Sequence, residues 1–224
     1  MITTHKISTM DRSDISNYLI NKKLENPNYK IIDVGGSMGG WSHSFADAIV
    51  DFNEGSSNDK IKHFKADINL ESDWNEILKY VSENGKFDFC ICAHTLEDIV
   101  NPSVPVKMFN YISKAGYIAT PSKYRELSYW ESDWHKPDHN GEPIKFLGYI
   151  HHRWIFDIID GQYTAFPKIN FIDSYPPLKE IGNPDDNVSD LSLFWEEEVN
   201  LKIMNNGFLG PSMHSVISYY NALI

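Results

Sequence analysis

A glycine-rich segment near the start of the chain contains the residue types of a ligand-binding turn. Asp33, Gly35, Gly36, Ser37 and Gly39 directly follow the apolar run YKII. Glycines at such a position let the backbone turn sharply and approach a ligand without Cβ clashes. The segment predicts a ligand over this turn. The same pattern also occurs in purely structural turns, so the interpretation depends on the segments downstream.

Polar side chains follow the next three strand-like runs. Asp51, in AIVDFN, stands where a carboxylate can accept hydrogen bonds from both ribose hydroxyls of a nucleoside, with Asn53 as the alternative. Asp67, in KADIN, could accept a hydrogen bond from an adenine amino group, and His94 with Thr95 would lie at the mouth of the site. Each also has a structural interpretation, as a solvated acid, a turn cap or a hydrogen-bonded histidine. Their common place at strand ends favours the ligand-binding interpretation.

Four residues are candidates for a general base. A hydroxyl that is being alkylated loses its proton as the new bond forms, and histidine is the usual proton acceptor near neutral pH. His94, His151 and His152 fit this role. If YIHHRWIF is a strand, His151 and His152 point to opposite faces, so at most one of them faces the site. Glu126, after the fifth strand-like run, is the fourth candidate, with a surface charge as its structural interpretation.

Histidines and aspartates are also frequent in the second half of the chain, where they could bind a divalent ion. Their spacing is not diagnostic of a metal site, so no metal site is predicted, although a divalent ion stays possible. The residues concerned are Asp133, His135, Asp138, His139, His151 and His152. Cys90 and Cys92 would point to the same face of one strand and are expected to be buried, reduced thiols.

Strand-like and helix-like runs alternate through the first half of the chain. Strands are expected at 29–36, 48–53, 62–68, 86–96 and 116–120, and helices at 11–25, at 73–83, between Gly39 and Asp51 (short), and around Val106, Phe109 and Ile112. Ser13 or Asp14 would cap the first helix, which would lie against the sheet edge, and Ser72 would cap the second. Such alternation predicts an α/β fold with a doubly wound, mostly parallel sheet and helices on both faces.

The composition changes after Pro121. Aromatic residues become dense, and they could stack on a sugar or an aromatic acceptor or fill a small second core; they are Tyr124, Tyr129, Trp130, Trp134, Tyr149, Trp154 and Phe156. YIHHRWIFDII and AFPKINFI are strand-like, and SLFWEEEVNLKIM is helix-like. We expect a single domain over 1–224, in which 1–121 is the cofactor-binding half and 122–224 completes the sheet and forms the substrate wall.

The series DVGGSMG, AIVDFN, KADIN, FDFCICAHTLED and GYIATPS resembles the ordered motifs of class I, Rossmann-like S-adenosylmethionine-dependent methyltransferases over about residues 29–122. The resemblance implies that the glycine turn lies under the methionine part of the cofactor and that Asp51 binds the ribose. It also implies that Asp67 with Ile68 binds the adenine and that His94 and Thr95 lie beside the sulfonium. One departure is Ser37, which replaces a family glycine and is tolerated at negative φ.

The resemblance implies an enzyme that uses S-adenosylmethionine and releases S-adenosylhomocysteine. We expect O-methylation of a hydroxyl on a sugar, a glycan or another small acceptor. N- or carboxyl-methylation of a small metabolite or protein is an alternative, and so is a noncatalytic cofactor-binding module. A dinucleotide-dependent oxidoreductase is disfavoured because the glycines run GGSMGG rather than GxGxxG.

Charge and hydropathy restrict the partners. A formal net charge of −11 disfavours nucleic acid, whose phosphates attract clustered Lys and Arg, and suits a small neutral or sugar-like acceptor. Apolar runs are too short to span a bilayer, and the N-terminal residues do not resemble a signal peptide. The polar stretch at 53–60 is expected to be a loop. These features predict a cytoplasmic protein without membrane or nucleic-acid partners, and they leave its oligomeric state open.

Overall fold

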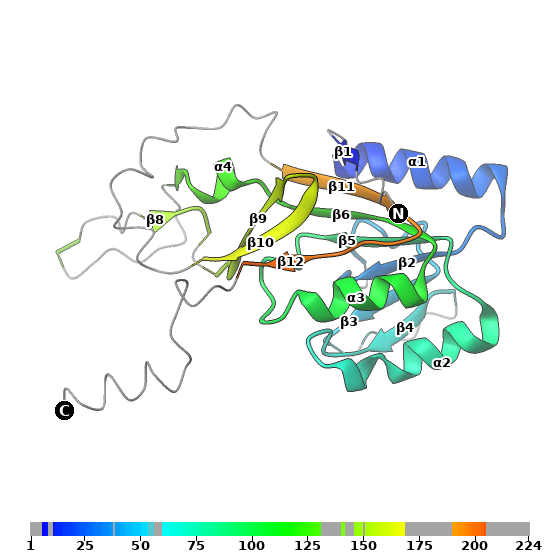
Figure 1. Cartoon of the computed structure of the whole chain (residues 1–224). Coiled ribbons are helices and arrows are strands. Elements are labelled where there is room, and N and C mark those ends of the chain that lie inside the picture. The colour runs from blue at the N-terminus through cyan, green and yellow to red at the C-terminus, as the bar shows by residue number, and fades with distance from the viewer. Residues whose placement is uncertain are drawn as a thin grey trace.

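The computed structural model has a central sheet with helices on both faces (Figure 1). The structure describes residues 6–8, 11–37, 39–53, 55, 60–130, 140–141, 146–149, 151–168 and 190–204. The strands in this part of the chain are β1 (Lys6–Ser8), β2 (Ile31–Val34), β3 (Ala48–Asp51), β4 (Lys62–Lys65), β5 (Phe89–Ala93), β6 (Ala115–Pro121), β7 (Tyr129–Trp130), β8 (Phe146–Leu147), β9 (Trp154–Ile159), β10 (Gln162–Pro167), β11 (Asp190–Glu196) and β12 (Lys202–Ile203). The helices are α1 (Arg12–Glu25), α2 (Asn75–Asn84), α3 (Ser103–Ile112) and α4 (Lys123–Glu126), with a 3₁₀ turn at Glu71–Trp74.

The main sheet has the strand order β1-β11-β6-β5-β2-β3-β4. Strands β2 to β6 are parallel, whereas β11 is antiparallel to β6 and β1 is antiparallel to β11. Within it, β4-β3-β2-β5-β6 reproduces the 3-2-1-4-5 order of doubly wound nucleotide-binding sheets. The winding reverses between β2 and β5, and ligands bind beyond the strand ends at such a switch point. The predicted doubly wound, mostly parallel sheet is confirmed.

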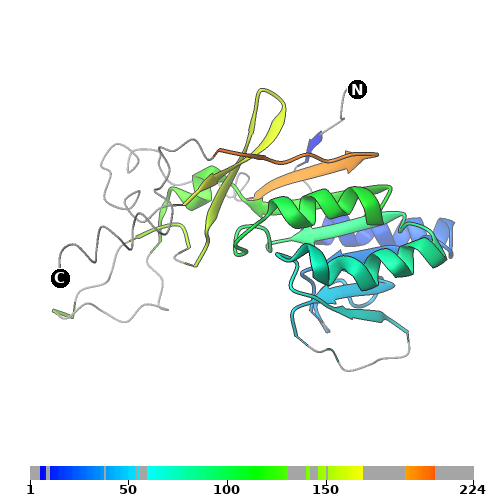
Figure 2. The same ribbon diagram turned by 60° about the horizontal axis from the view of Figure 1, so that its bottom comes forward.

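The helices cover opposite faces of the sheet (Figures 1 and 2). On one face, α1 packs Ile15 and Leu19 onto β2, β5 and β6, so it covers the middle of the sheet and not, as predicted, its edge. On the other face, α2 and α3 pack Ile77 and Phe109 into the larger core. Because helices cover both faces of the sheet and exclude water from it, β2 is buried at all four positions.

Several local predictions are wrong at element ends. Asp11, not Ser13 or Asp14, caps α1 by accepting hydrogen bonds from the Ser13 and Asp14 N–H groups. Ser72 does not cap α2, because it lies inside the preceding 3₁₀ turn and its hydroxyl donates to Asp73. The short helix expected between Gly39 and Asp51 is a series of turns followed by β3. At both helix starts, the hydrogen bond that each side chain makes to a nearby group decides whether that residue caps the helix.

The second half of the chain departs most from prediction. The helix-like run SLFWEEEVNLKIM instead forms most of β11 and then β12. All seven residues of β11 pair with β6, and the alternating burial of Leu193 and Trp195 fits a strand packed against the core. Strand β9 begins at Trp154, so His151 and His152 precede it. Strands β9, β10 and β12 form a second small sheet beside the ends of the parallel strands (Figure 2).

Two further sequence predictions concern burial and membrane insertion. Cys90 and Cys92 are free and buried, as expected, and desolvation raises the pKa of both thiols well above the ordinary value. Among the described residues, no helix has both the length and the apolarity needed to cross a bilayer.

Candidate active site

Two cavities lie beyond the carboxyl ends of the parallel strands. The smaller, of about 350 Å³, is lined by Gly35, Val50, Asp51, Phe52, Ala66, Asp67, Ile68, Asn69, Thr95, Asp98, Ile99, Val100 and Arg153. The larger, of about 650 Å³, is lined by Asp11, Arg12, Ser13, His94, Glu97, Asp98, Pro121, Arg125, Tyr149, His151, His152 and Asp190. Asp98 lines both, so the two cavities adjoin at its side chain.

The smaller cavity brings together residues that the sequence predicted to share a ligand. Gly35 follows β2, Asp51 ends β3, Asp67 and Ile68 follow β4, and Thr95 follows β5. They converge because parallel strands end at the same edge of the sheet. The smaller cavity therefore combines a glycine turn, two carboxylates and apolar side chains.

The glycine turn packs against the end of β5. Gly35 has a left-handed φ of 82°, and its N–H donates to the Val50 carbonyl at 2.9 Å. A Cβ at this position would lie 2.4 Å from the Thr95 side chain, so Gly35 cannot be replaced without a shift. Ser37 is not among the described non-glycine residues with positive φ, so it meets the condition for replacing a glycine.

Asp33 supports the turn from below. Its carboxylate is buried and accepts a hydrogen bond from the Ser42 hydroxyl, and desolvation raises the pKa of Asp33 to about 6 despite that bond and the nearby Arg12. A Cβ on Gly36 would lie 2.2 Å from the Asp33 carboxylate. Neither cavity is lined by Asp33, Gly36, Ser37 or Gly39.

The acids at the ends of β3 and β4 are partly engaged by their own loops. Asp51 accepts the N–H of Asn53 at 3.1 Å, and Asn53 itself lines neither cavity. Asp67 accepts the side-chain amide of Asn69 at 2.8 Å. Sequence reasoning missed Phe52, which is 68% exposed and lines the smaller cavity. An aromatic residue directly after a strand-end acid was the available signal.

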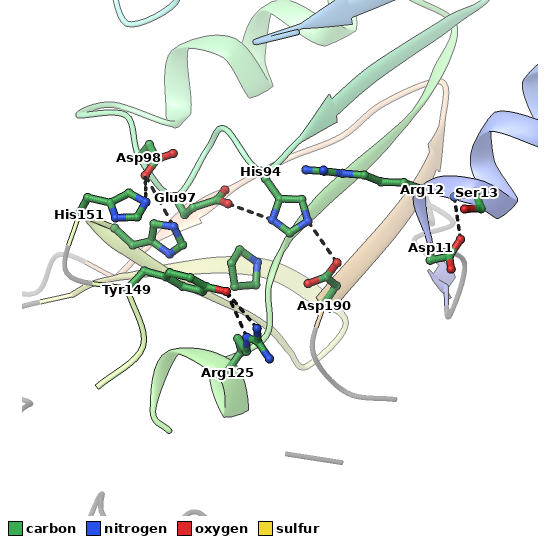
Figure 3. A pocket seen from close by; sticks show the side chains of 12 residues that line it. Asp11, Arg12, Ser13, His94, Glu97, Asp98, Arg125, Tyr149, His151 and Asp190 are labelled. Carbon is green, nitrogen blue, oxygen red and sulfur yellow. Dashed lines mark hydrogen bonds and ion pairs between the residues drawn. The ribbon is translucent and has the colours of Figure 1, made fainter. Parts of the chain in front are cut away.

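His94 is held between two carboxylates in the larger cavity (Figure 3). Its Nε2 lies 3.1 Å from Asp190 Oδ2, and its Nδ1 lies 3.4 Å from Glu97 Oε1. Burial alone would lower the pKa of His94, but these two carboxylates raise it to about 9. His94 is therefore an imidazolium at neutral pH, which is a hydrogen-bond donor and not a general base.

Glu126 and His152 form a buried pair behind the same cavity. The Glu126 carboxylate is fully buried, lies against His152 Nδ1, and accepts a hydrogen bond from Lys168 Nζ at 2.6 Å. A carboxylate at Nδ1 accepts the N–H of that nitrogen and so directs Nε2 away from Glu126. His152 Nε2 lies 3.7 Å from Asp98 Oδ1. Glu126 thus fixes the orientation of His152 and does not line the cavity.

His151 and His152 reach the same place. The expectation that they point to opposite faces is wrong, because both precede β9 and lie 3.7 Å from the Asp98 carboxylate. The Tyr149 ring packs on His152 at a centroid distance of 4.6 Å, and the Tyr149 hydroxyl accepts hydrogen bonds from Arg125. Asp98, His151 and His152 place one potential metal-ligand atom each within 4.8 Å of one another.

The remaining aromatic and metal candidates fall into three groups. Phe156 is buried in the larger core and stacks on Tyr163, and the Trp154 indole donates to the Ile99 carbonyl, so both have structural contacts. Tyr124 is exposed and lines neither cavity. Asp133, Trp134, His135, Asp138 and His139 lie outside the described residues, as do the side chains of Tyr129 and Trp130.

No protein-family model matches the chain, and no curated protein sequence matches it. The chain is similar to the solved N-terminal domain of EvdMO1 in the presence of SAH and D-fucose, with 12% identity, 84% coverage of each chain and a TM-score of 0.38. It is also similar to an S-adenosylmethionine-dependent methyltransferase from Mesorhizobium loti (13% identity, 83% of this chain and 98% of that one, TM-score 0.34). A third similar structure is a putative S-adenosylmethionine-dependent methyltransferase from Listeria monocytogenes, with 12% identity, 80% coverage of this chain, 95% coverage of that one and a TM-score of 0.37. The fold assignment rests on the strand order given above.

Proposed function

We propose that this chain is an S-adenosylmethionine-dependent methyltransferase that methylates a hydroxyl of a sugar or another small hydroxylated acceptor. The observation that carries the proposal is the smaller cavity. It gathers, from the ends of four separate strands, the glycine, acids and threonine that the sequence motifs assign to the cofactor. Residues brought together in this way supply hydrogen-bond acceptors and close backbone approach for a nucleoside.

On the cofactor side, the proposal gives each lining residue a chemical task. Asp51 accepts hydrogen bonds from the ribose hydroxyls, and Phe52 with Ile68 packs on the adenine. Asp67 and Asn69 present polar atoms to the adenine edge. Gly35 and Thr95 form the wall next to the sulfonium, on the side that leads to Asp98.

On the acceptor side, the larger cavity favours a neutral, hydroxyl-rich molecule. Its lining contains four carboxylic acids, Asp11, Glu97, Asp98 and Asp190. They outnumber the three cations Arg12, Arg125 and His94, which disfavours an anionic acceptor. Arg125 and Tyr149 line the same cavity with polar groups that can hydrogen-bond to sugar hydroxyls. The exposed parts of both cavities meet at Asp98, so an acceptor in one can reach a methyl group carried in the other.

Methyl transfer from a sulfonium is an in-line displacement, in which the carbon–sulfur bond breaks as the carbon–oxygen bond forms. The leaving group is already activated, so alignment of the acceptor supplies much of the rate. The acceptor hydroxyl must also lose its proton. Among the four candidates, His152 fits activation of that hydroxyl best, because Glu126 fixes its ring and Nε2 is directed toward Asp98.

Calorimetric titration with S-adenosylhomocysteine tests the cofactor site. Wild type and Glu83→Ala, which removes an exposed acid of α2, should bind with equal affinity. Asp51→Ala should bind at least about tenfold more weakly, because it loses hydrogen bonds to a charged acceptor. No binding by folded wild type, or equal binding by all three proteins, would reject the proposal.

An acceptor panel with methyl-labelled S-adenosylmethionine then tests the reaction. Label should pass to glycosides or other alcohols in wild type and be lost in His152→Gln. Transfer only to amines or carboxylates would assign the alternative N- or carboxyl-methylation. Cofactor binding without transfer to any acceptor would favour a noncatalytic binding module.

A further inference from the structure

One carboxylate and two imidazoles converge at the rim where the two cavities meet. Asp98 Oδ1 lies 3.7 Å from His151 Nε2 and 3.7 Å from His152 Nε2. The ligand atoms of all three residues lie within 4.8 Å of one another. Figure 3 shows the Asp98 and His151 side chains pointing toward each other on the wall of the larger cavity.

We propose that Asp98, His151 and His152 bind a divalent transition-metal ion, which in turn binds the acceptor hydroxyl. Ligand atoms about 2.0–2.1 Å from a tetrahedral ion lie about 3.4 Å apart. The two Asp98–histidine distances of 3.7 Å are slightly longer, and the two histidine nitrogens lie within 4.8 Å of each other. Asp98 and His151 are exposed side chains that can rotate inward by this amount, whereas His152 is fixed.

The surroundings of His152 distinguish this group from a chance cluster of surface residues. Metal-ligating histidines commonly donate their other ring N–H to a carboxylate, which fixes the ring and makes the ligating nitrogen more basic. Glu126 occupies that position at His152 Nδ1 and is itself held by Lys168. The Lys168 and Glu126 side chains are only 8% and 0% exposed, so water has little access to this ion pair.

The ligand set restricts the metal. Two imidazoles and one carboxylate suit Zn²⁺, Co²⁺, Ni²⁺ or Fe²⁺ better than Mg²⁺ or Ca²⁺, which prefer oxygen ligands. Three protein ligands leave a coordination position open toward the cavity, as in catalytic metal sites. The acceptor hydroxyl would occupy this position and have its pKa lowered by the ion, so that its proton passes to water. This consequence rests on the proposed function. In it, His152 acts during the reaction as a metal ligand and not as the general base.

Visible absorption of Co²⁺ tests the site without relying on methyl transfer. Metal-free wild type, prepared with a chelator and without an affinity tag, should bind one equivalent of Co²⁺ and develop the ligand-field bands of a protein-bound ion. Asp98→Asn and His152→Gln should abolish the bands. Glu126→Gln should weaken binding about 10–100-fold, the usual effect of removing the carboxylate behind a ligating histidine. Asp190→Asn, a matched change in the same cavity outside the cluster, should bind normally.

Two outcomes would overturn the proposal. One is no Co²⁺ binding by folded wild type, and the other is equal binding by wild type, Asp98→Asn and His152→Gln, which would indicate an adventitious ion only. Titration of the same proteins with S-adenosylhomocysteine separates the two proposals. Cofactor binding without Co²⁺ binding rejects the metal site alone and leaves His152 Nε2 as the general base.

Discussion

Replacing His94 with asparagine should remove a pH-dependent part of the free energy of unfolding. The His94 ring lies between Asp190 and Glu97, at 3.1 and 3.4 Å. Burial opposes the charged form, but the two carboxylates raise the pKa of His94 to about 9. Asparagine is a suitable replacement because His94 has a left-handed φ of 51°, which asparagine tolerates well.

The magnitude follows from linkage between protonation and folding. Raising the pKa from 6.5 to about 9 stabilises the folded chain by about 3 kcal/mol, at 1.36 kcal/mol per pH unit. The His94 side chain is 27% exposed, so screening by solvent reduces this stabilisation in part. The stabilisation is fully present below pH 6.5 and is lost as the pH rises through 9. Roughly 2 kcal/mol of it should disappear between pH 7 and 9.5.

Urea unfolding of wild type and His94→Asn at pH 7 and pH 9.5 measures the effect. The difference in unfolding free energy between the two proteins should shrink by about 2 kcal/mol over this interval. Comparison with the variant cancels the other groups that titrate in the same range. A difference that does not change with pH would refute the assignment of His94 as an imidazolium. Asp190→Asn, which removes one partner, should give an intermediate result.

Two further predictions concern the glycine turn. Gly35→Ala should lower the unfolding free energy by about 1–3 kcal/mol and weaken S-adenosylhomocysteine binding, because the new Cβ would lie 2.4 Å from Thr95 at a φ of 82°. Gly85→Ala, at a φ of 77° with nothing within 4 Å of the new Cβ, should cost less, and equal costs in urea unfolding would exclude the contact with Thr95 as the cause. Asp33→Asn should abolish a fall in stability with rising pH: the folded pKa of about 6 lies above the ordinary 3.8, so wild type loses roughly 3 kcal/mol as the pH rises from 3.8 through 6. Between pH 4.5 and 7.5 wild type should lose about 2 kcal/mol more unfolding free energy than Asp33→Asn, and the same loss in both proteins would contradict the assignment.

Much of the cofactor half was predictable because its signals are local. An apolar run followed by an acid or glycines indicates a strand and the turn after it, and parallel strands place their carboxyl ends at one edge. Gly35, Asp51, Asp67, Ile68 and Thr95 therefore meet in one cavity as the spacing predicted. Asp33 turns its carboxylate toward Ser42 and lines neither cavity, because sequence gives the position of a residue but not the direction of its side chain.

The acceptor half depended on contacts between distant segments. Asp190 lies 96 residues from His94 and turns a candidate base into a cation, and Lys168 lies 42 residues from the carboxylate it fixes. Strand β11 forms where the sequence favoured a helix because it pairs along its whole length with β6. The sequence by itself determined the five parallel strands, the glycine turn and the strand-end acids, since these depend on short-range patterns. Only the tertiary structure decided which histidine is charged and which is fixed toward Asp98, since charge and orientation depend on neighbours that spacing does not reveal.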